Sequence, residues 1–254
     1  MPAVILVLIL IAGPASAQRT TSPILEDILR RNEEAMGGRV ALDGVQSVWR
    51  QRNAHTFTLR QKPDKHVVVL LDSAGSVRYA EGFDGTDAWE IVDDGPKRPV
   101  SQRARTALWH VTQFPSELRP LARLRDSGHS LSMLGRSRIG GLEYFEILVR
   151  LSDGFERTYY VHPQTYQIER SRDVRRHHAY EEQQQPIEGT WSDFRQVESL
   201  VLPFTTGERN YETGERLSGG TMVQIRLDVL MPEAVFSPTG SLQPFLDYLR
   251  KEAR

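Results

Sequence analysis

The chain has 254 residues, with 32 Lys or Arg against 33 Asp or Glu and a net charge of −1. This balance argues against a dedicated nucleic-acid-binding protein, whose domains are usually basic. The sequence contains no cysteine, which excludes disulfide bonds and the cysteine-linked lipid anchor of bacterial lipoproteins. We therefore expect a soluble monomer that is stabilised by its apolar core alone.

The N-terminus has the pattern of an export signal. Residues 4–12 are all apolar, Gly13-Pro14 ends this run, and Ala15-Ser16-Ala17 fits a small-residue cleavage site. That order is typical of a secretory signal peptide, although no Lys or Arg precedes the apolar run. The run is too short for a comfortable membrane span. We expect removal of residues 1–17 and export to the periplasm; an uncleaved anchor and a buried core segment are the alternatives.

An amphipathic helix is predicted next. Ser22-Pro23 is a favourable helix start, and Gly37-Gly38 is a favourable end. The apolar residues between them recur at helical spacing, so the helix needs a sheet or another helix to cover its apolar side. A short helical piece through residues 40–45 follows.

Strands are predicted from residue 48 onward. Polar and apolar residues alternate over residues 48–60, which predicts one half-buried antiparallel strand. Residues 66–71 are largely apolar on both faces, so this strand is expected to be covered on both sides. Residues 77–83 and 88–92 continue the series, with a tight turn at Asp84-Gly85.

The middle of the chain changes to a helical pattern over residues 102–125, which Phe114-Pro115-Ser116 divides into two pieces. Strands then return, separated by Gly-Gly, Asp-Gly and His-Pro turns typical of hairpins. Their expected ranges are 131–139, 142–151, 155–161, 165–171, 204–211 and 222–229, with exposed or glycine-rich turns at 181–189 and 217–220 and a final helix over 241–250. About ten strands without strand–helix–strand units predict a mainly β (α+β), antiparallel fold.

Four motifs occur in order along the chain. They are residues 34–39 (Glu-Ala-Met-Gly-Gly-Arg), Phe83-Asp84-Gly85 with Trp89, Asp153-Gly154 with residues 157–160, and residues 192–195 (Ser-Asp-Phe-Arg) with Leu202-Pro203. In order and spacing they resemble the outer-membrane lipoprotein carrier family, the LolA/LolB-like proteins, in its broader lipoprotein-sorting branch.

The resemblance implies a half-open antiparallel β-barrel with helices covering its concave face, formed by residues 18–254 as a single lipid-binding domain. It also implies a cavity for the acyl chains of lipids or lipoproteins, with no catalytic residue, metal or cofactor. Residues 102–125 stand where the lid of such a carrier would lie. A transient membrane-protein partner is compatible with this role.

Apolar side chains on the expected strand faces are candidates for the cavity lining. Each buried methylene of a lipid would contribute roughly 0.8 kcal/mol. An ordinary protein core is the alternative role for each residue. The candidates are Trp49, Phe57, Leu59, Val68, Leu70, Tyr79, Phe83, Trp89, Tyr144, Phe145 and Ile147. For the family's lid-closing arginine the candidates are Arg50 and Arg52, which could equally belong to a solvated strand face.

Other chemistry has weaker support. His177 and Glu181 are four residues apart, as are His178 and Glu182, so each pair would share a helix face. A third metal ligand, a His-Glu-x-x-His motif, a Gly-x-Ser-x-Gly motif and a phosphate loop are all missing from the sequence. A non-catalytic carrier is thus favoured over a lipid-sensing module that reports to a membrane regulator, and a metal-dependent hydrolase ranks last.

Two basic groups could contact anionic headgroups or a membrane partner. They lie within residues 97–105 and 170–176. Asp193 could be mistaken for a catalytic acid, but a local pair with Arg195 is the expected role.

Overall fold

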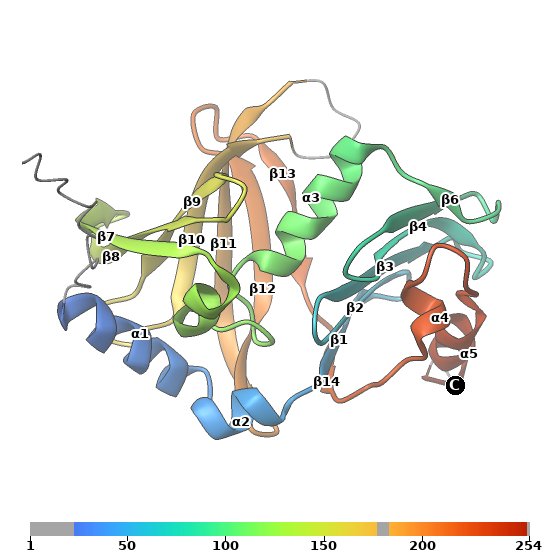
Figure 1. Ribbon diagram of the computed structural model, residues 1–254, viewed down its shortest axis with the longest axis horizontal. Helices are drawn as coiled ribbons and strands as arrows, with labels where there is room; N and C mark the ends of the chain where they lie inside the picture. The colour runs from blue at the N-terminus through green and yellow to red at the C-terminus, as the bar shows by residue number, and fades with distance from the viewer. Residues whose placement is uncertain (1–22, 177–182, 253–254) are drawn as a thin grey trace, which may run out of the picture.

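The computed structural model describes residues 23–176 and 183–252 of the chain. Two antiparallel seven-stranded sheets stand side by side, and they do not close into a barrel (Figure 1). Helix α3 (Gln102–Gln113) runs between the two sheets, and helix α1 (Pro23–Ala35) lies at the left of the view, below the strands labelled β7 and β8. The predicted mainly β, half-open architecture is confirmed.

Sheet A contains the early strands of the chain. In order across the sheet, its strands are β14 (Gln224–Leu227), β1 (Ser47–Asn53), β2 (Thr56–Gln61), β3 (Lys65–Leu71), β4 (Val77–Phe83), β5 (Ala88–Val92) and β6 (Arg98–Pro99). The single strand predicted over residues 48–60 is wrong, because the chain turns between β1 and β2. The Asn53 side-chain oxygen accepts a 2.8 Å hydrogen bond from the His55 N–H, which stabilises a turn without Gly or Pro.

Sheet B is a meander in chain order. Its strands are β7 (Ser130–Ile139), β8 (Leu142–Arg150), β9 (Glu156–Val161), β10 (Ile168–Arg175), β11 (Gln185–Val197), β12 (Leu200–Asn210) and β13 (Arg216–Thr221). The glycine-rich turn predicted at 217–220 is wrong, since these residues belong to β13. A Cβ at Gly219 would lie 2.5 Å from the Gly207 Cα, so the glycines permit a close backbone approach. Residues 185–189 lie in β11 and are not a turn.

The helices are α1 (Pro23–Ala35), α2 (Arg39–Gly44), α3 (Gln102–Gln113), the 3-10 helix η1 (Leu121–Ser127), α4 (Glu233–Phe236) and α5 (Gln243–Glu252). The predicted helical segment with a break at residues 114–116 is confirmed by α3 and η1. Ser101 caps α3, because its hydroxyl accepts a 3.2 Å hydrogen bond from the Ala104 N–H. Helix α1 packs with η1 against sheet B, through the core residues Leu25, Ile28, Leu29, Leu121 and Leu124.

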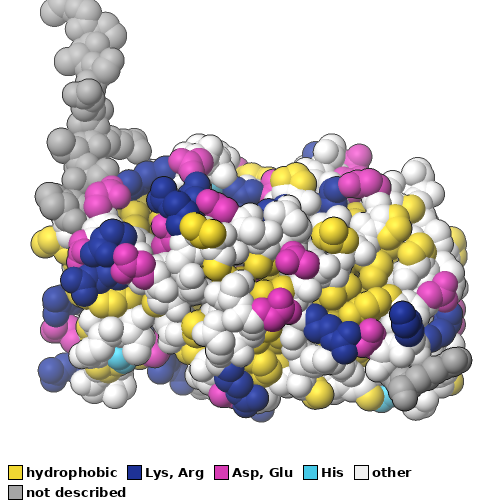
Figure 2. Space-filling model, turned by 90° about the horizontal axis from the view of Figure 1, so that it is seen from below, with side chains coloured by type: hydrophobic (Ala, Val, Ile, Leu, Met, Phe, Trp, Pro, Cys, Tyr) yellow, Lys and Arg dark blue, Asp and Glu magenta, His cyan; other side chains and the backbone are white. Residues whose placement is uncertain are grey.

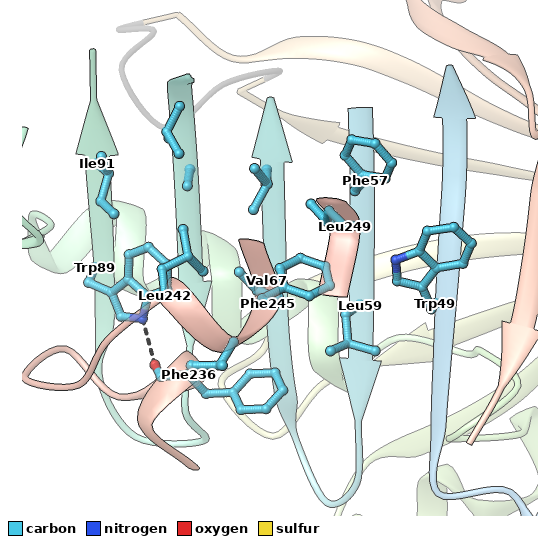
Figure 3. Close-up of a cluster of buried hydrophobic side chains, with 14 residues drawn as sticks. Trp49, Phe57, Leu59, Val67, Trp89, Ile91, Phe236, Leu242, Phe245 and Leu249 are labelled. Atoms are coloured by element: carbon cyan, nitrogen blue, oxygen red, sulfur yellow. Dashed lines mark hydrogen bonds between the residues drawn. The ribbon is translucent and has the colours of Figure 1, made fainter. Parts of the chain in front are cut away.

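A second core lies on the opposite side of sheet A from α3. There α4 and α5 cover the strands, as Figure 3 shows. The Trp89 Nε1 donates a 2.5 Å hydrogen bond to the Phe236 carbonyl. The Trp89 ring lies directly on Gly82, where a Cβ would come within 2.4 Å of the ring. The C-terminal helices therefore close the outer face of sheet A, which the sequence pattern alone did not place.

Candidate functional site

The inner face of sheet A is the face that α3 covers. The buried Phe83 of β4 packs against Leu108 of α3. Because side chains alternate along a strand, Tyr79 and Glu81 share this face with Phe83. The strand register places Val68 opposite Glu81 and Leu70 opposite Tyr79. These side chains form a mixed apolar and polar surface beside α3.

The structure separates the predicted cavity residues into three places. The candidates on the inner face of sheet A are Val68, Leu70, Tyr79 and Phe83, of which Phe83 is buried and the others are half-buried. The candidates under α4 and α5, on the outer face, are Trp49, Phe57, Leu59 and Trp89 (Figure 3). Sheet B holds the remaining three. Of these, Phe145 and Ile147 pack in the core with α1, and Tyr144 donates a 2.8 Å hydrogen bond to Glu169.

Residues 102–127, which comprise α3, the connection 114–120 and η1, are hereafter the covering segment. Its Glu117 forms an ion pair with Arg50 of β1, with 2.8 Å between Nη2 and Oε2. The Arg50 and Glu117 side chains are only 13 % and 6 % exposed. Arg52, the other predicted lid-closing candidate, lies instead against Gly220 of β13. Of the two arginines, Arg50 forms the ion pair that joins sheet A to the covering segment.

The covering segment contacts sheet B as well. The His110 Nε2 lies 2.7 Å from an Asp153 carboxylate oxygen in the turn between β8 and β9. Phe114 packs edge-on against Phe155, with 5.7 Å between ring centroids. The Arg157 guanidinium of β9 lies 3.7 Å from the centroid of the Phe114 ring. The segment therefore bridges the two sheets.

Buried charged groups surround the contact of Arg50 with the covering segment. Arg60 of β2 lies directly opposite His66 of β3. His66 is 5 % exposed. Burial, together with the positive charges of Arg60 and Arg50, lowers the pKa of His66 to about 3, so its ring is neutral at pH 7. From sheet B, Arg157 pairs with Asp173 at 2.5 Å.

Three of these residues were not predicted from the sequence: Arg60, Glu117 and Arg157. Alternation over residues 48–60 places Arg60 on the same face as Arg50, but the unrecognised turn at Asn53 hid that the two arginines lie on neighbouring strands. Glu117 follows the Pro115 break with no local motif, and its partner is distant in the sequence. No periodic pattern reports such a long-range ion pair.

The two basic groups are held largely by contacts within the chain. Arg170 and Arg172 both bind the fully buried Glu188, at 2.9 Å and 2.8 Å. The Lys97 ammonium lies 3.8 Å from the Trp89 ring centroid and donates to the Ser237 carbonyl. The view from below in Figure 2 shows Lys and Arg interspersed with Asp and Glu, with apolar side chains between them. That face carries mixed charge.

The expected local pair of Asp193 with Arg195 is confirmed, with a 2.6 Å contact. His177, His178, Glu181 and Glu182 lie outside the described residues, as does the expected signal peptide. Within residues 23–176 and 183–252, no group of three His, Asp or Glu side chains could hold a metal ion. In the same ranges, no helix combines the length and hydrophobicity needed to span a membrane.

No family model and no curated protein matches the sequence. Solved structures do resemble it. A DUF1329 family protein from Desulfovibrio piger has a TM-score of 0.54 at 12 % identity, over 85 % of this chain and 98 % of that one. A LolA superfamily protein from Nitrosomonas europaea gives 0.52 at 13 % identity, over 84 % and 96 %. A putative outer membrane lipoprotein-sorting protein domain from Vibrio parahaemolyticus gives 0.50 at 12 % identity, over 84 % and 97 %.

At these identities the comparisons concern the fold. The predicted resemblance to the LolA-like, lipoprotein-sorting proteins is confirmed at that level: this chain has their fold.

Proposed function

We propose that the protein is a non-enzymatic periplasmic carrier that binds the acyl chains of a lipid or lipoprotein. The binding surface is the inner face of sheet A, and the covering segment is its lid. The observation that carries the proposal is the buried ion pair of Arg50 with Glu117, which fastens the covering segment to the sheet face that carries Val68, Leu70 and Phe83. For lipid to enter and leave the binding surface, this ion pair would have to break and form again.

The energies are compatible with such a cycle. Removing one partner of a buried ion pair costs about 3–5 kcal/mol, and opening the covering segment costs less because it returns both charges to water. An acyl chain that buries ten methylenes gains about 8 kcal/mol. A single chain can therefore offset the opening of the covering segment, whereas a short polar molecule cannot. This difference favours long-chain cargo.

The test is native mass spectrometry of residues 18–254, purified from the periplasm without detergent, followed by organic extraction. We expect a stoichiometric lipid or acylated peptide. Leu70→Asp should lose it, because a carboxylate would enter the apolar part of the inner face. Leu134→Asp is the matched control, since Leu134 is 54 % exposed on the edge strand β7.

A folded Leu70→Asp variant that retains as much lipid as the Leu134→Asp control would contradict the proposed surface. A wild-type protein that carries no lipid, even after incubation with lipid vesicles, would contradict the carrier function. Leu59→Asp is not informative for retention, because Leu59 is fully buried under α4 and α5 and its loss would unfold the protein.

A further inference from the structure

Positive charge exceeds negative charge where the covering segment meets sheet A. Arg157 shares Asp173 with Arg175, at 2.5 Å and 3.3 Å. Among the described residues, Arg50 and Arg60 are then left with a single carboxylate, that of Glu117. Arg60 has no ion pair within 4 Å among the described residues, and Glu117 acts on it only at longer range.

The bonding of Glu117 is also incomplete. Its Oε2 contacts Arg50, while its buried Oε1 has no hydrogen-bond partner within the described part of the chain. Burial alone would raise the pKa of Glu117, but Arg50 and Arg60 lower it to about 2, so the carboxylate is ionised at neutral pH. Two guanidinium groups thus face one carboxylate that binds only one of them. An anion held by both would make more charge-assisted hydrogen bonds.

A small cleft leads from the surface to Arg60. It is lined also by Lys65 and Asp64 and by Thr112, Ser116 and Arg119 of the covering segment; Asp64 pairs with Arg119, and Lys65 pairs with Glu233. Its volume of about 20 Å³ is room for one water molecule. A carboxylate or phosphate group is larger, so it could reach both arginines only by displacing Glu117.

We propose that Arg50 and Arg60 bind the acidic headgroup of the carried amphiphile, and that Glu117 fills this anion site while the covering segment is closed. This inference rests on the proposed carrier function and adds the ligand class, an amphiphile with a phosphate or carboxylate head. Entry of the headgroup breaks the Arg50–Glu117 contact and so releases the covering segment. The headgroup of an acidic ligand thereby assists the opening of the site, whereas a neutral amphiphile of equal chain length must open it through its acyl chain alone.

The experiment compares three probes with the same oleoyl chain: oleate, oleoyl lysophosphatidate and the uncharged monoolein. Affinities are measured by native mass spectrometry and tryptophan fluorescence, below the critical micelle concentration of each probe. Wild type should bind the acidic probes about ten- to a hundredfold more tightly than monoolein, the range expected for hydrogen bonds to a charged group. The affinities for oleate and lysophosphatidate then show whether the site prefers a carboxylate or a phosphate group.

Three variants locate the effect. Arg60→Gln should bind all three probes with similar affinity, whereas Arg195→Gln, which removes an exposed arginine of sheet B, should keep the wild-type preference. Glu117→Gln should bind the acidic probes about tenfold more tightly than wild type, because the internal competitor has lost its charge. Circular dichroism checks that each variant is folded.

The outcomes separate the two proposals. If wild type binds the three probes equally well, the anion site is refuted and the carrier function stands; this comparison needs no variant. If none of the probes binds, both proposals fail. If the preference exists but persists in folded Arg60→Gln, the anion is bound elsewhere and the assignment to this site is refuted.

Discussion

His66 should make the stability of the protein fall at mildly acidic pH. In the folded protein its ring is buried, faces Arg60 and Arg50, and has a pKa of about 3. In the unfolded chain its pKa should return to the ordinary value of about 6.5. Between these two values the unfolded state binds a proton that the folded state does not. Stability is therefore unaffected by His66 above pH 6.5 and falls as the pH decreases from 6.5 towards 3.

The size of the effect follows from the same two pKa values. Each pH unit within the window changes the free energy of unfolding by about 1.4 kcal/mol. At pH 4.5, two units below the unfolded value, His66 should cost the wild-type protein about 3 kcal/mol relative to pH 7.5. A typical domain has only about 5–15 kcal/mol of stability, so the loss is large enough to measure.

The assay is urea denaturation of wild type and His66→Gln at pH 7.5 and at pH 4.5. Glutamine keeps a polar side chain of similar size but does not titrate. Other groups titrate equally in both proteins, so the difference between the two pH-dependent changes isolates His66. Wild type should lose about 3 kcal/mol more than the variant on going to pH 4.5. If both proteins lose the same free energy of unfolding, His66 is not a buried, neutral side chain in the folded protein, and the described packing of Arg60 against it is also wrong.

Three further predictions concern sheet A. Trp89→Phe should lower the free energy of unfolding by about 1–3 kcal/mol in urea denaturation, because it leaves the Phe236 carbonyl without its 2.5 Å hydrogen bond. An unchanged midpoint would contradict this bond. Gly82→Ala should cost about 1–3 kcal/mol, seen as a lower melting temperature, since its Cβ would lie 2.4 Å from the Trp89 ring; wild-type stability would mean that the ring can move. Burial raises the pKa of Glu81, so the contribution of Glu81 to stability should decrease as the pH rises above 4.5, and Glu81→Gln should lack this part of the pH dependence. Parallel pH profiles for the two proteins would show that Glu81 is solvated.

The sequence predicts this fold well where turn chemistry is local. Asp153-Gly154 and Gly140-Gly141 mark hairpins of sheet B, and both are found. The turn after Asn53 was not predicted because a side chain, not a glycine or proline, stabilises it. The strand at 216–221 was predicted as a turn because glycine usually signals one, whereas here glycine permits close packing of two backbones.

The candidate site was harder to predict for a different reason. Alternation groups Trp49, Phe57 and Leu59 on one side of their segment and Val68 with Leu70 on one side of theirs. It does not show that the two groups lie on opposite faces of the sheet, or which face meets which helix. That choice depends on α3 and α5, which are far away in the chain. The ion pair of Arg50 with Glu117 depends on the same long-range packing, so a single sequence carries no signal for it.

The position of α4 and α5 has a consequence for how the molecule is made. Sheet A is built mainly from strands near the beginning of the described chain, yet its outer core is completed by residues 233–252. A chain that crosses a membrane from its N-terminus would emerge with Trp49 and Trp89 uncovered until nearly the last residue has followed. Such distant contacts also slow folding. If the chain is exported as proposed, its early strands need protection from aggregation during that passage, and removal of α5 should yield a protein that aggregates.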